Sequence, residues 1–198
     1  RGFYFVAVTS SNPEWNGAGI SELYHYDLDS KSYQKIALNW DWGLGGDYAV
    51  TPAGVLTHLA NGATRTLAFC KKEDDRWLQQ MINLEGKEEH LSFFEASEDG
   101  QKIVFDHSTS NQLPTYYVAD LTLKRGNLAF GQQQVLAKLN KILQKKERTR
   151  YEILRWQGYQ NEEVNGILYY PADYVEGKQY PLVLSIHGGP SSVDLDLW

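Results

Sequence analysis

The residues best suited to chemistry are His187, Gly188, Gly189 and Pro190, which stand in a row. They directly follow Pro181–Ile186, a run in which five of six residues are apolar and proline occupies only the first position. Such a run predicts a strand buried on both faces of a sheet. The two glycines let the chain turn sharply after it and leave backbone N–H groups uncovered. These groups would face the crevice beyond the strand, where open α/β sheets bind ligands, although a tight turn without chemistry gives the same pattern.

The neighbouring residues favour a chemical role for this loop. Gly166–Pro171 reads Gly-Ile-Leu-Tyr-Tyr-Pro, and Tyr180–Pro190 reads Tyr-Pro-Leu-Val-Leu-Ser-Ile-His-Gly-Gly-Pro. Together with Trp156, these runs resemble the opening of the catalytic domain in the prolyl oligopeptidase family of serine peptidases. The His-Gly-Gly-Pro form is usual in the acylaminoacyl-peptidase branch, and the likeness covers residues 156–198. The turn Gln157–Gln160 departs from the pattern, because many relatives have Asp-Gly there.

The resemblance implies a role for each residue of the loop. In α/β-hydrolases the loop after this strand supplies one N–H of the oxyanion hole, and the residue after the nucleophile supplies the other. Gly189 would donate that N–H, and Gly188 would shape the loop. His187 and Pro190 would support it, and His187 would not be the catalytic base. Short peptides are the implied substrates, with Ser-His-Asp acyl transfer as the reaction and no metal or cofactor.

The sequence contains no Gly-x-Ser-x-Gly, the pattern that carries the nucleophile in α/β-hydrolases. The chain stops at Trp198, before a nucleophile strand could appear. None of the Ser/Asp/His triad is therefore expected in this span. Because acyl transfer needs a nucleophile and a base as well as an oxyanion hole, we expect the 198 residues to be inactive by themselves.

A recurring pair of strands is the main pattern upstream of this loop. In each copy an alternating strand is followed by a turn and a second strand that ends in Asp/Asn-Leu. The copies are Phe3–Ser10 with Leu23–Leu28, Thr64–Lys71 with Trp77–Leu84, and Lys102–Ser108 with Thr115–Leu121. The closing leucines are 56 and 37 residues apart, which brackets the roughly 40–50 residues of a four-stranded propeller blade.

We therefore predict a mainly β chain with two parts. Residues 1–142 would be the last four-stranded antiparallel blades of a β-propeller, with a β-sandwich as the alternative. Residues 143–198 would be a linker and the first strands of an α/β-hydrolase domain. The linker would include the basic stretch 138–150 and one helical turn through Leu136, Leu139 and Leu143.

Composition limits the partners. The net charge is −6, and no aromatic residue interleaves the basic stretch 138–150, so we expect no nucleic-acid binding. No apolar run approaches the roughly 20 residues that cross a bilayer. Cys70 is the single cysteine, which excludes an internal disulfide and a cysteine-based metal site. Residues 1–8 have the pattern of a strand, so we expect a chain that begins within its fold. It would be a soluble protein of the cytoplasm, the periplasm or the exterior, and a homo-oligomer is compatible with its composition.

Other candidate side chains have simpler interpretations. The histidines other than His187 lack metal-ligand spacing and are expected at ordinary strand positions; they are His25, His58, His90 and His107. Asp194 and Asp196 lie near the loop and could contact substrate or the blades. The segment Trp40–Gly46 would either line a cavity or form an inter-blade connection whose tryptophans pack, and the second is favoured.

Three functions remain open at this point. The first is a serine peptidase whose propeller restricts access to the catalytic domain. The second is an esterase-like α/β-hydrolase with a β-rich leader. The third is a non-catalytic propeller that binds partners and carries a remnant of a hydrolase.

Overall fold

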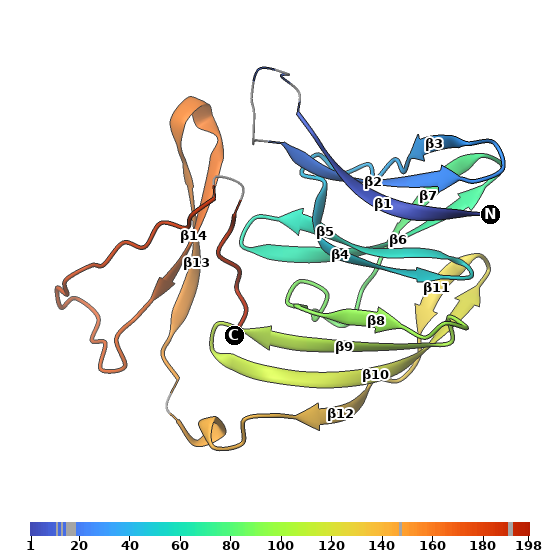
Figure 1. The fold of residues 1–198 in the computed structure, drawn as a ribbon. Coiled ribbons are helices and arrows are strands. Elements are labelled where there is room, and N and C mark those ends of the chain that lie inside the picture. Colours follow the sequence, from blue (N-terminus) through green and yellow to red (C-terminus); the bar gives the residue numbers. More distant parts are fainter. Residues whose placement is uncertain (11, 13, 15–18, 147, 190–191) are drawn as a thin grey trace.

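The computed structural model describes residues 1–10, 12, 14, 19–146, 148–189 and 192–198. Its regular structure is almost all β and the sheets are antiparallel, as predicted (Figure 1). The first sheet has the order β1-β2-β3, formed by Gly2–Thr9, Ile20–Asp27 and Ser32–Lys35. The second has the order β4-β5-β6-β7, formed by Leu44–Thr51, Gly54–Asn61, Thr64–Glu73 and Arg76–Met81.

The third sheet is built around a long strand, β10 (Gln112–Lys124). One edge of β10 pairs with β9, which pairs with β8; the other edge pairs with β12 near its start and with β11 near its end. These partners are β8 (Phe94–Ala96), β9 (Lys102–Thr109), β11 (Asn127–Phe130) and β12 (Gln134–Lys138). A separate hairpin joins β13 (Tyr151–Gln157) to β14 (Glu163–Tyr169).

The three sheets stack, with the second sheet between the other two (Figure 1). Strand β6 shows the reason. Leu67 and Phe69 are fully buried in the core shared with the third sheet, whereas Ala68 and Cys70 are fully buried in the core shared with the first. Successive side chains on a strand point to opposite faces, so this run of apolar residues covers both faces of the middle sheet. Burial also raises the pKa of the Cys70 thiol to about 12, which leaves it unreactive.

The three predicted strand pairs are confirmed, but they are not equivalent. They correspond to β1–β2, β6–β7 and β9–β10, of which the second pair closes its sheet and the third lies in the middle of its sheet. The closing leucines differ accordingly. Leu84 and Leu121 are buried in one core, whereas Leu28 is 46% exposed. The intervals between the closing leucines are unequal because the repeated strand pair occupies a different position in each of the three sheets.

The hairpin follows the prediction, but the predicted helical turn through Leu136, Leu139 and Leu143 is wrong. Leu136 lies in β12, which pairs with β10, and the 3-10 turn η1 spans only Leu143–Lys145. A second 3-10 turn, η2 (Tyr159–Asn161), connects β13 to β14. Strands β13 and β14 occupy the two positions expected after the linker. No described helix is long and apolar enough to cross a membrane.

The predicted buried strand Pro181–Ile186 is wrong for this structure. The segment forms no strand, and Leu182, Val183, Leu184 and Ile186 are between 78% and 90% exposed. A strand buried on both faces needs neighbouring strands for its backbone groups and helices over its side chains. None of the described strands pairs with this segment, and no described helix covers it, so its apolar side chains stay open.

His58 makes the core sensitive to pH. It lies buried on β5 with its ring edge-on to Phe94, at 4.6 Å between centroids, and none of the described residues hydrogen-bonds to its Nε2. Burial, and then the positive charge of Arg65, lowers the pKa of His58 from 6.5 to about 4. The folded state therefore holds the neutral ring at pH 7, whereas the unfolded chain takes up a proton below pH 6.5.

Because the folded pKa is the lower one, stability is fully present above pH 6.5 and is lost as the pH falls toward 4. At about 1.4 kcal/mol per pKa unit, the loss from this residue is about 3 kcal/mol. We expect His58→Phe to flatten the free energy of unfolding over this pH range, measured by urea denaturation at several pH values. Parallel curves for the two proteins would refute this assignment.

Candidate functional site

The predicted oxyanion loop lies on the surface. His187, Gly188 and Gly189 are all exposed, and the His187 Nδ1 atom lies 2.9 Å from the carbonyl oxygen of Gly188. A β-carbon built on Gly188 would meet nothing within 4 Å. Pro190 lies outside the described residues. The structure thus brings His187 against the loop backbone and places no other described residue over it.

Gly189 has the one special conformation in the loop. Its φ is +145°, a region that L side chains rarely adopt, so a glycine is needed there. A glycine at this point also leaves the adjoining backbone amide uncovered on an exposed turn. The geometry is compatible with an N–H that is offered to a ligand, which is the role the sequence predicts for Gly189.

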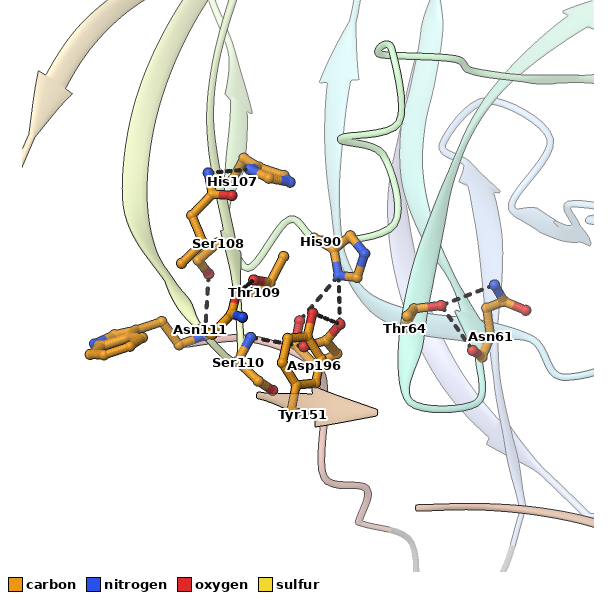
Figure 2. Close-up of polar contacts among 12 residues, drawn as sticks. Asn61, Thr64, His90, His107, Ser108, Thr109, Ser110, Asn111, Tyr151 and Asp196 are labelled. Atoms are coloured by element: carbon orange, nitrogen blue, oxygen red, sulfur yellow. Dashed lines mark hydrogen bonds and ion pairs between the residues drawn. The ribbon is translucent and has the colours of Figure 1, made fainter. Parts of the chain in front are cut away.

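A second polar cluster was not predicted as a site. It gathers around Asp196, which is only 2% exposed and lies between the ends of the sheets and the hairpin (Figure 2). The Tyr151 hydroxyl donates to its Oδ2 at 2.9 Å, and the Ser110 backbone N–H donates to its Oδ1 at 2.8 Å. His90 Nδ1 lies 3.5 Å from Oδ2 and 3.2 Å from the Asp196 carbonyl oxygen. The Asp196 N–H in turn donates to the carbonyl of Ala63 at 2.7 Å.

The protonation of this cluster follows from its burial. Burial raises the pKa of the Tyr151 phenol, so the phenol remains a hydrogen-bond donor to the carboxylate. Burial also lowers the pKa of His107, whose ring lies edge-on to His90 at 5.9 Å between centroids. The neighbouring imidazole of His90 adds to this effect because two positive rings at this separation repel.

The cluster has the pairing of a carboxylate with an imidazole but no nucleophile. A pocket of about 480 Å³ lies beside it, lined in part by His90, Tyr151 and Asp196. Among the residues that the structure describes, no serine, threonine or cysteine side chain bonds to the ring of His90, and no group of three or more His, Cys, Asp or Glu residues could hold a metal ion. The hydrogen bonds of Asp196 to Ser110 and Ala63 hold the C-terminal segment against the sheets.

Removing this fastening should have a measurable cost. Asp196→Ala leaves the Ser110 N–H and the Tyr151 hydroxyl without their acceptor, which costs about 1–3 kcal/mol for buried donors. We expect amide hydrogen exchange in residues 192–198 and at Ser110 to accelerate. Asp194→Asn is the matched control, because Asp194 lies two residues away and is exposed. Equal exchange in the two variants would contradict the role of Asp196.

Only a weak signal for this cluster is present in the sequence. The sequence predicts that Asp196 could contact either a substrate or the preceding strands, and the structure places it against Ser110, between β9 and β10. His90 was expected at an ordinary polar position, and nothing local indicates that it meets a residue 106 positions away. Tyr151 was expected only as the first residue of a strand. No pattern within one segment could have joined these three residues.

Comparison with known proteins adds little. No protein-family model matches the chain, and no curated protein matches it. Among solved structures, the AtxE2 isopeptidase is similar in two states, a variant with Astexin3-dC4 bound and the apo protein. Each covers 83% of this chain at 13% identity, with TM-scores of 0.28 and 0.27. The chain spans 32% of those chains, and a TM-score this low carries no argument about fold or function.

Proposed function

We propose that the chain is part of a serine peptidase of the prolyl oligopeptidase family that hydrolyses short peptides. In this proposal the three stacked sheets are the last blades of a β-propeller that restricts access to the catalytic domain. Strands β13 and β14 and the segment 181–189 open that domain, and Gly189 donates one N–H of the oxyanion hole. The nucleophile, its base and the supporting aspartate come from a chain that continues beyond Trp198.

The observation that carries the proposal is the order of two features. An apolar strand pattern, Pro181–Ile186, runs without interruption into His187, Gly188 and Gly189, which is the order that the oxyanion loop of an α/β-hydrolase requires. One feature of the structure supports it: Gly189 has a conformation that favours glycine.

The test is made on the full-length gene product. We expect a fluorophosphonate probe to label one serine, located by mass spectrometry in a Gly-x-Ser-x-Gly pattern beyond Trp198. Substrate trials then compare an N-acetylated dipeptide amide with the matching ester, because a peptidase cleaves both whereas an esterase cleaves only the ester.

The other outcomes have distinct meanings. An absence of labelling in a well-folded protein would overturn the proposal in favour of a propeller that binds partners. Labelling with cleavage of esters alone would assign an esterase instead. Labelling of a serine within residues 1–198 would place the chemistry in the sheets and overturn the role given to Gly189.

A further inference from the structure

A pocket of about 610 Å³ lies where the first sheet, the second sheet and the hairpin meet. Its wall includes the start of β4, the turn between β5 and β6, and Val193 from the C-terminal segment. The side chains of Ile20, Leu44 and Trp42 supply apolar surface. This pocket is separate from the Asp196 cluster, and nothing in the proposed mechanism uses it.

Arg65 supplies the only cation among the described residues that line this pocket. It is half-buried, and its one side-chain hydrogen bond to a described residue goes to the carbonyl of its neighbour Thr64 at 3.3 Å. No described carboxylate forms an ion pair with it. A guanidinium has five N–H donors, so most of the hydrogen-bonding capacity of Arg65 is unused. Burial lowers the pKa of Arg65, because its charged form is partly removed from water.

Glycine at position 45 is what allows Arg65 to lie there. A β-carbon on Gly45 would come within 2.4 Å of the Arg65 Cδ atom and 2.7 Å of the Ala60 backbone nitrogen. Any other residue would push the arginine stem out of the wall. The Gly-rich start of β4 therefore serves to position the side chain of Arg65.

Trp42 forms a fixed aromatic surface in the same pocket. It is 53% exposed and packs edge-on against Trp40, with ring centroids 6.1 Å apart. Trp40 is itself anchored, because its Nε1–H donates to the Ala60 carbonyl at 2.6 Å. Of the two roles predicted for Trp40–Gly46, packing is seen for Trp40 and lining a cavity is seen for Trp42.

We propose that this pocket binds an organic carboxylate, with the carboxylate on Arg65 and an apolar or aromatic body against Trp42. A planar carboxylate matches the fork of a guanidinium, and such charge-assisted bonds are the stronger ones. Glu162 and Glu163 also line the pocket, on the hairpin, and Glu163 pairs with Arg155 at 3.7 Å. Their charges favour a ligand with a single negative charge over a phosphate dianion. The site stands whether or not the protein is a peptidase.

The test compares, on the full-length protein, three probes that share a phenyl ring: benzoate, its neutral isostere benzamide, and phenyl phosphate. The protein is first treated with fluorophosphonate, so that a reactive serine site, where one exists, is blocked. We expect benzoate to bind at least about tenfold more tightly than benzamide by calorimetry. Equal affinity of the acid and the amide, or tighter binding of phenyl phosphate, would overturn the proposal.

Variants locate the binding. Arg65→Gln should abolish the preference for benzoate over benzamide, and Trp42→Ala should weaken both probes alike. Arg76→Gln is the matched control, because it removes the same charge from an exposed position on the same sheet. Unchanged binding by Arg65→Gln would overturn the site. Should that variant not fold, Arg65→Lys keeps the charge but loses the fork and should reduce the preference.

Discussion

In the proposed peptidase, replacement of Gly189 by proline should lower kcat about 10²–10³-fold, because it deletes the N–H that Gly189 is proposed to donate to the oxyanion. The enzyme would still bind its substrate in the ground state, since the missing hydrogen bond forms only in the transition state. KM should therefore change little. The measurement is steady-state hydrolysis of an N-acetylated amino-acid p-nitroanilide, with the rate of fluorophosphonate labelling as a second readout.

Gly189→Ala is the matched control at the same position. Alanine can adopt the φ of +145° only with strain, and proline, whose ring fixes φ near −65°, must change the backbone of the loop; only alanine keeps the N–H. We expect alanine to retain much more of the activity than proline. Equal losses in the two variants would show that the conformation of the loop matters and that its N–H does not. Unchanged kcat in both would remove Gly189 from the site.

The strands were predictable where a local pattern coincides with local burial. Strand β6 is the clearest case, because Leu67 and Phe69 alternate with Ala68 and Cys70 and every one of them is fully buried. The start of β4 was harder to predict as a strand. Gly45 and Gly46 lower the strand propensity, and its pairing with β5 shifts in register between Leu44 and Tyr48.

The segment Pro181–Ile186 shows the limit of such patterns. Its sequence indicates that the side chains favour burial, but it does not say which strand or helix covers them. The contacts of Asp196 also could not be predicted from a local pattern. They join residues 45, 86 and 106 positions apart, and each partner looks ordinary within its own segment. The loop could therefore be predicted from a local sequence pattern, whereas the Asp196 cluster depends on tertiary contacts that no local pattern shows.

Phe69→Ala should lower the free energy of unfolding by about 3–5 kcal/mol, the largest stability effect expected in the stacked sheets. Phe69 is fully buried in the core that joins the second and third sheets. Its loss leaves a cavity between two sheets whose strands are fixed by their own ladders, so little collapse is available to fill it. Urea denaturation gives the change, and Phe3→Ala on β1 is the control, because Phe3 is 50% exposed and should cost far less.

A double substitution with Gly54 shows whether the ring is held as the structure indicates. A β-carbon on Gly54 would come within 2.8 Å of the Phe69 ring and 2.4 Å of the Cys70 carbonyl oxygen, at a φ of +154°. Gly54→Ala should thus destabilise the protein in either background. Removing the ring relieves only the first contact, so Gly54→Ala should cost less in Phe69→Ala than in the native sequence, by about 0.5–3 kcal/mol of coupling. Strictly additive losses would mean that the Phe69 ring does not lie against Gly54, and the packing of β6 on the β4–β5 turn would have to be redrawn.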